Sequence, residues 1–125
     1  MKIPFIATLV CLMSSGWLYA DGALHPAHGG RMVEVGGHRL ELVTRGERVD
    51  LYVTDHGDRA VALDKATGKV TLLGAGGKVE IGLAPAGGNR LSGTGAPAGA
   101  EQSAAVIGVD GLDKRIAARL PAGQK

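Results

Sequence analysis

The sequence predicts an all-β protein, specifically an immunoglobulin-like antiparallel β-sandwich of about seven or eight short strands, preceded by a signal peptide. Apolar and polar residues alternate from position 31 onward, as in strands that bury one face. Glycine-containing turns interrupt this alternation about every 8–12 residues. No stretch sustains a helical period. These observations are typical of a sandwich or a small barrel, and we predict the sandwich.

The first twenty residues have the features of a cleaved signal peptide. Met1 and Lys2 provide a positive start, residues 3–13 form an apolar run, and a more polar region follows up to Ala20. The run is shorter than the roughly 20 apolar residues that span a bilayer. We therefore expect the signal peptide to be cleaved either after Ala20 or after Gly22. The mature protein is then expected to be periplasmic and not embedded in the membrane.

After cleavage, we expect a flexible histidine-containing segment over residues 21–30, a β-domain over residues 31–120 and a frayed tail over residues 121–125. The alternating residues that define the strands of this domain are, in chain order, Val33 and Val35; Leu40 and Leu42 within residues 38–44; Val49, Leu51 and Val53; Val61 and Leu63; Val70 and Leu72; Val79, Ile81 and Leu83; residues 104–109; and residues 115–120.

Two further segments are predicted to be a loop and the last strand. Residues 92–100 are rich in Gly, Pro and Ala, which predicts a surface loop. Residues 113–120 fit a helix capped by Asp113, but Ile116, Ala118 and Leu120 alternate, so we predict the last strand there.

Composition restricts the functions available to this domain. The 125 residues support one small domain, and 14 Lys and Arg nearly balance 12 Asp and Glu, which offers no basic stripe for nucleic acid. Cys11 is the sole cysteine and lies in the signal peptide, so cleavage removes disulfides and thiolate chemistry. Because no catalytic nucleophile or cofactor motif stands out, we predict that the protein is not an enzyme.

The histidines carry the coordination chemistry. His25 and His28 are three residues apart in a sequence that also contains Gly29 and Gly30, and imidazole is a ligand for Cu, Zn and Ni ions. His56 and the thioether of Met32 complete the predicted metal-ligand set. Cleavage after Gly22 would also place His25 third from a free amine, in a square-planar Cu(II) or Ni(II) chelate. The alternative is a mobile polar segment with no ligand.

The segment Asp55-His56-Gly57-Asp58 has several interpretations. It lies where a hairpin must turn, and Asp and Gly suit that turn without further function. His56 is also a candidate metal ligand, and Asp55 could orient its imidazole for general base work or bind Ca²⁺ with Asp58. No Ser or Cys stands beside it as a nucleophile, so we favour the turn.

The sequence also resembles a known protein class through His28-Gly29-Gly30, Tyr52, Asp55-His56 and residues 85–89. It is similar over about residues 28–120 to a small exported β-domain of Gram-negative bacteria. That domain occurs alone or attached to periplasmic adaptor proteins of heavy-metal efflux systems. The resemblance implies a periplasmic location and a link to metal handling, and it transfers no ligand set to individual residues.

Two functions of different class follow. In the first, the protein is a periplasmic metal-binding or metal-handling accessory module linked to heavy-metal efflux or resistance, with a Cu, Zn or Ni ion as cofactor and an efflux adaptor or other envelope protein as partner. In the second, it is a non-catalytic interaction domain of an envelope assembly without a metal role.

Overall fold

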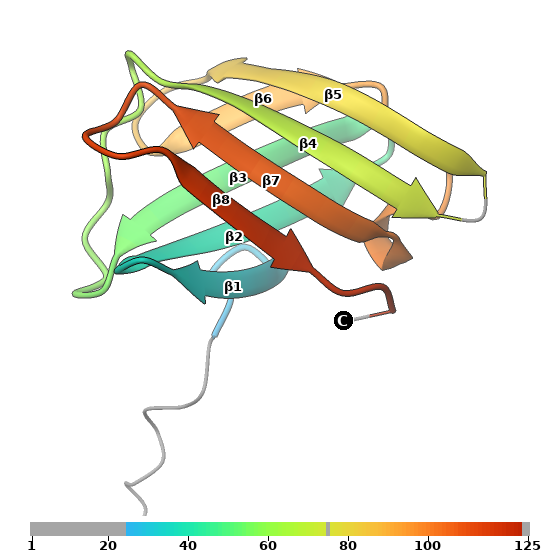
Figure 1. Cartoon of the computed structure of the whole chain (residues 1–125), viewed down its shortest axis with the longest axis horizontal. Helices are drawn as coiled ribbons and strands as arrows, with labels where there is room; N and C mark the ends of the chain where they lie inside the picture. Colours follow the sequence, from blue (N-terminus) through green and yellow to red (C-terminus); the bar gives the residue numbers. More distant parts are fainter. Residues whose placement is uncertain (1–24, 75, 124–125) are drawn as a thin grey trace, which may run out of the picture.

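The computed structural model describes residues 25–74 and 76–123, and eight antiparallel strands form a single sheet there (Figure 1). The predicted signal peptide and both cleavage positions lie outside the described residues. The strands are β1 (Arg31–Val35), β2 (His38–Arg45), β3 (Arg48–Asp55), β4 (Thr67–Gly74), β5 (Gly77–Pro85), β6 (Arg90–Thr94), β7 (Ala104–Asp110) and β8 (Ile116–Leu120). A one-turn 3-10 helix, η2 (Ala100–Gln102), precedes β7.

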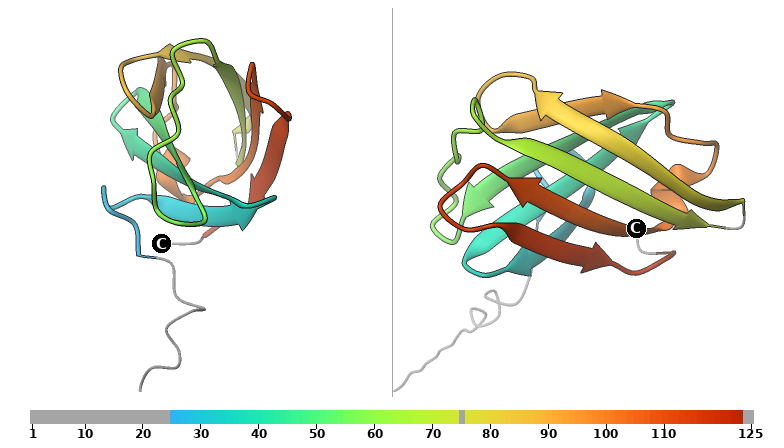
Figure 2. Two further views of the ribbon diagram at one scale, coloured as in Figure 1. Left: turned by 90° about the vertical axis from the view of Figure 1, so that its left-hand side faces the viewer. Right: turned by 45° about the horizontal axis from the view of Figure 1, so that its top comes forward.

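The sheet curls into a nearly closed barrel. Its strand order is β1-β2-β3-β6-β5-β4-β7-β8, and the two outer strands, β1 and β8, come to lie side by side (Figure 2). The all-β prediction is therefore confirmed, whereas the two packed sheets of an immunoglobulin-like sandwich are not. Alternation shows that each strand buries one face, and a curled sheet satisfies that requirement as well as two packed sheets do.

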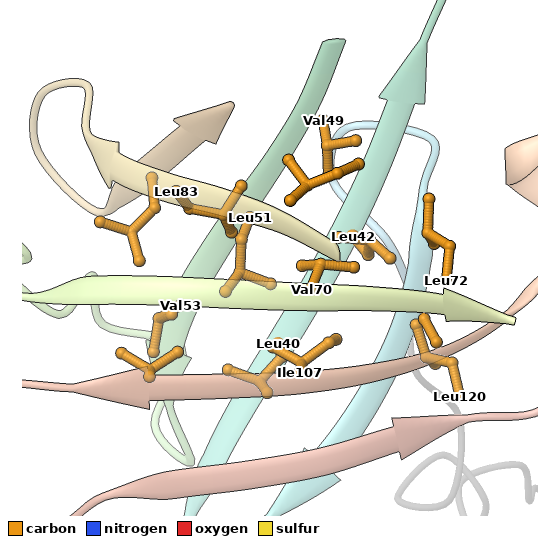
Figure 3. Packing of buried hydrophobic residues seen from close by; sticks show 14 of the residues in the cluster. Leu40, Leu42, Val49, Leu51, Val53, Val70, Leu72, Leu83, Ile107 and Leu120 are labelled. Atoms are coloured by element: carbon orange, nitrogen blue, oxygen red, sulfur yellow. The ribbon is translucent and has the colours of Figure 1, made fainter. Parts of the chain in front are cut away.

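Aliphatic side chains fill the space that the sheet encloses (Figure 3). Residues at alternate positions of each strand point inward, and cross-strand partners such as Leu42 and Leu51 share this inner face. The fully buried large side chains are Leu40, Leu42, Leu51, Leu63, Leu72, Leu91, Ile107, Leu120, Val49, Val53, Val70 and Val109. Leu51 and Val53, two of the alternating residues predicted to define a strand, are both fully buried in β3.

The predicted loop over residues 92–100 is confirmed only over residues 95–99, and the predicted strand at residues 61–63 is wrong. Residues 92–94 belong to β6 rather than to a loop, because Leu91 is buried and Gly93 lets β6 approach β5 closely. A β-carbon at Gly93 would collide with the carbonyl oxygen of Gly82. Residues 61–63 form no strand; they cross one end of the barrel, where Leu63 donates a backbone hydrogen bond of 3.1 Å to Gly88.

The C-terminal strand is confirmed over Ile116–Leu120, and residues 113–115 precede it without helix. Beyond it, the predicted tail is held to the domain at two points. The Gly123 amide donates to the Gln102 carbonyl at 2.8 Å, and the Pro121 carbonyl accepts from Arg31 at 3.4 Å.

Arg31 links β1 to β8 along the line where these two outer strands lie side by side, which we call the seam. It is opposite Leu42 and therefore faces inward, where it is only 6% exposed. Its Nη1 donates to the carbonyls of Ser103, at 2.8 Å, and Pro121, which flank β7 and β8. Burial lowers the pKa of the Arg31 guanidinium from its ordinary value, and the negative charge of Glu101 opposes this shift.

The position of Leu51 predicts a large effect of truncation. Leu51→Ala removes a fully buried side chain from the middle of the barrel, so we expect it to lower the free energy of unfolding by about 2–4 kcal/mol in urea denaturation. The matched control is Val106→Ala on the outer face of β7, where Val106 is 37% exposed, with an expected change within about 0.5 kcal/mol. Equal effects of the two substitutions would contradict the interior assignment.

Candidate functional site

The outer face of β1, β2 and β3 carries side chains that are unlike the aliphatic interior. The strand register aligns Met32, Glu41 and Tyr52, one from each strand, in a row across this face. Arg90 of β6 continues the row beside Tyr52. Since cross-strand partners share a face, these four side chains all lie outside the barrel.

Glu41 holds residues 28–30 against this face. Its carboxylate Oε2 accepts hydrogen bonds from the backbone amides of His28, at 2.9 Å, and Gly30, at 2.8 Å. Its Oε1 lies 2.8 Å from Nδ1 of His28. Glu41 is only 4% exposed, so the segment both covers the carboxylate and supplies its hydrogen-bond donors.

Tyr52 stacks against one face of the His28 ring. The two rings are stacked, with centroids 3.6 Å apart and planes 7° from parallel. The plane of the imidazole is therefore set by Tyr52, and its rotation within that plane is set by the bond to Glu41. Since Glu41 occupies Nδ1, Nε2 is the ring nitrogen that remains for a ligand.

An open hollow of about 450 Å³ lies where residues 25–28 meet this face. His25, His28 and Met32 line it, so the structure brings three of the four predicted metal-ligating residues to one place. Within residues 25–74 and 76–123, no cluster of three or more His, Cys, Asp or Glu residues could hold a metal ion. The imidazoles of His25 and His28 and the thioether of Met32 are among the side chains that line the hollow.

His56, the fourth predicted ligand, lies in the turn after β3 and does not line this hollow. The turn forms as the sequence indicates: Asp55 Oδ1 accepts the backbone amides of Gly57, at 2.8 Å, and Arg59, at 3.0 Å. The Arg59 amide above all, with the Gly57 amide and the Arg59 guanidinium, holds the pKa of Asp55 below its ordinary value, against the opposing effect of desolvation. The geometry of Asp55 is that of a turn-forming aspartate.

Charged side chains border the hollow. Arg39 is paired with Asp58 and lies 3.5 Å from Glu34, so this cation joins β1, β2 and the turn after β3. Asp58 has a positive φ of 64°, a conformation that aspartate tolerates better than most residues. Arg39 and Asp58 both line the hollow beside Thr54, and their opposite charges balance there.

Asp50 forms a second polar group on the same face. It is 1% exposed, and its Oδ2 accepts from Nη2 of Arg48 at 2.9 Å, while Nη1 of Arg90 lies 3.8 Å from Oδ1. Burial by itself raises the pKa of Asp50. Hydrogen bonds from Ser92 and Arg48, with the positive charges of Arg48 and Arg90, outweigh burial and hold the pKa below its ordinary value.

Glu41 was not among the residues predicted from the sequence, although its position in the hairpin was a signal for it. The tight turn at Gly46 pairs Arg45 with Arg48, and counting back along both strands places Glu41 opposite Tyr52. Glu41 lies between Leu40 and Leu42, which face inward, so its carboxylate is on the same outer face as Tyr52. The fold of residues 28–30 over Glu41 had no such signal, because it depends on a contact outside the strand pattern.

Comparisons with known proteins give no identification: no protein-family description, no curated protein and no solved structure matches the chain. In the part of the chain that the structure describes, no helix is long and apolar enough to cross a membrane.

A methyl group at position 30 should separate residues 28–30 from β2. A β-carbon there would collide with the Leu42 carbonyl oxygen and lie 2.8 Å from a methyl of Val43. We expect Gly30→Ala to separate residues 28–30 from β2 and to speed hydrogen exchange of the His28 amide by tenfold or more, that is, by about 1.4 kcal/mol or more of local stability. Gly82→Ala is the control, because a β-carbon at Gly82 meets open space. Unchanged exchange in Gly30→Ala would contradict the close approach.

Asp50 predicts a specific acid dependence of stability. Because its folded-state pKa is depressed, its contribution is complete above the unfolded value of about 3.9 and is lost as the pH falls through the folded-state pKa. We expect Asp50→Asn to cost about 1.5–3 kcal/mol at neutral pH and progressively less in acid, measured by urea denaturation at several pH values. The control is Asp110→Asn, at an exposed carboxylate 3.1 Å from Arg115, with an expected effect below about 1 kcal/mol. A cost of Asp50→Asn that stays constant into acid would show that its charge is not the source.

Proposed function

We propose that this protein is a periplasmic metal-binding accessory module linked to heavy-metal efflux or resistance, and that His25, His28 and Met32 are its metal ligands. The observation that carries the proposal is that these three side chains line one hollow, beside the imidazole that Glu41 binds. They come from the N-terminal segment and from β1, which are joined directly at Gly30 and Arg31.

The geometry of His28 supports a ligand role. Metal-binding histidines commonly donate their second ring nitrogen to a carboxylate, which orients the ring and raises its basicity. Glu41 is such a carboxylate, at 2.8 Å from Nδ1, and Tyr52 holds the ring plane. The His28 side chain is still 39% exposed, so an ion from solution can reach it.

The donor set favours copper among the expected ions. Imidazole binds copper, zinc and nickel, whereas a thioether selects Cu(I). His25 and His28 would supply imidazole nitrogen, and Met32 would supply sulfur. Copper in its two oxidation states matches both donor types, and the site is open to solvent, as transfer of the ion to a partner requires.

The periplasmic location and the link to efflux rest on the sequence. The N-terminal segment has the features of a cleaved signal, and residues 28–120 resemble an exported domain associated with efflux adaptors. His28, Gly30 and Tyr52, which carry part of that resemblance, also build the face described above.

The test is a metal titration of the mature protein. Isothermal calorimetry with Cu²⁺, Zn²⁺ and Ni²⁺, and an anaerobic competition assay with Cu(I), should give saturable binding that is tightest for copper. His25→Ala and His28→Ala should each weaken binding by about tenfold or more, and Met32→Leu should weaken Cu(I) more than Zn²⁺.

The control substitution is His38→Ala, which removes a histidine at the start of β2 that lines a different depression. His56→Ala tests the remaining predicted ligand, and we expect no change because His56 lies outside the hollow. Absence of saturable binding, or binding unchanged in His25→Ala and His28→Ala, would reject the metal role and favour the interaction domain.

A further inference from the structure

We infer that Glu41 is the positioning residue of this site: it keeps the proton of the neutral His28 imidazole on Nδ1 and so presents Nε2 as the donor atom to the metal ion. The inference rests on the proposed function, since it names the residue that prepares one of the proposed ligands. It concerns a residue that touches His28 and not the ion.

The hydrogen bonds at the Glu41 carboxylate determine where the proton lies. A carboxylate only accepts hydrogen bonds, and Oε2 is already engaged by the backbone amides of His28 and Gly30. The remaining short contact joins Oε1 to Nδ1 of His28 at 2.8 Å. Nδ1 must be the donor in this contact, so in the neutral ring the lone pair belongs to Nε2.

Burial makes this arrangement selective. Glu41 is 4% exposed, and a buried carboxylate without donors costs far more than one that is fully hydrogen-bonded. The alternative tautomer would set the Nδ1 lone pair against Oε1 and would remove one of the donors that replace water. Tyr52 prevents the ring from tilting away, because it covers one face of the imidazole at a centroid distance of 3.6 Å.

Replacing Glu41 by glutamine should reverse the tautomer. A glutamine amide has one accepting oxygen and one donating NH₂ group. The oxygen is best placed at the position of Oε2, where two backbone amides donate. The NH₂ group then faces Nδ1, which has to accept, and the His28 proton moves to Nε2, the atom that would otherwise bind the metal.

The experiment is a long-range ¹H–¹⁵N NMR spectrum of histidine-labelled, metal-free protein in alkaline buffer, where imidazole is neutral. We expect His28 to carry its proton on Nδ1 in the wild type and on Nε2 in Glu41→Gln. Glu34→Gln is the matched control, because Glu34 is an outward carboxylate on β1 that lies near Arg39 and not near His28. It should leave the His28 tautomer unchanged.

The same variants are then titrated with copper. We expect Glu41→Gln to weaken copper binding by about 10–100-fold, as loss of a carboxylate behind a metal-bound histidine does, and Glu34→Gln to leave it unchanged. A wild-type spectrum with the proton on Nε2 overturns the inference, and it does so even if Glu41→Gln does not fold. A folded Glu41→Gln protein with the wild-type tautomer or the wild-type copper affinity overturns it as well.

Failure of the proposed function has a different signature. If the wild-type protein binds no metal, the metal role is rejected, while the proton assignment is judged from the metal-free spectra alone. If metal binds with the expected dependence on His25 and His28 but is insensitive to Glu41→Gln, the proposed function stands and the positioning role of Glu41 is rejected.

Discussion

The buried guanidinium of Arg31 links the two edges of this nearly closed barrel. It lies at the edge of the sheet, faces inward and donates to the carbonyls of Ser103 and Pro121 on the opposite edge. Burying a cation is costly unless hydrogen bonds replace water; the two carbonyls replace water at Nη1, whereas Nη2 is buried without a hydrogen-bond partner among the described residues. Because Met32 follows Arg31 and points the other way, the same contact that closes the barrel also fixes Met32 on the outer face. The seam contact and the candidate site therefore lie on opposite sides of β1.

The two faces of β2 carry different kinds of side chain. Leu40 and Leu42 point into an aliphatic interior, and Glu41 between them points outward and organises residues 28–30. Placing the charged residue on a rigid strand gives it a defined position, which a loop would not give. Two of the three proposed ligands, His25 and His28, precede β1, so the geometry of the hollow depends on how firmly Glu41 holds residues 28–30.

Much of the strand pattern was predictable because alternation and turn chemistry are local. The hairpin through Gly46 follows from inward leucines and valines on both sides of a glycine that takes positive φ. The strand β6 was missed because its inward positions are Leu91 and Gly93, and glycine carries no apolar signal even where close packing with β5 requires it. The strand predicted at residues 61–63 is absent for the opposite reason. Leu63 has the apolar side chain expected of an inward strand position, but it belongs to a loop that buries it at the end of the barrel.

By itself, the sequence determined that the described part of the chain is all-β and which residues of most strands face the core, and it identified the histidines as candidate metal ligands. These properties depend on side-chain type and on a period of two along the chain. The tertiary structure alone decided that one sheet curls into a nearly closed barrel, that Arg31 links its two edges, and that His25, His28 and Met32 line one hollow while His56 does not. The reason is physical: which strands become neighbours, and which carboxylate captures residues 28–30, depends on contacts between residues far apart in sequence, for which local alternation carries no information.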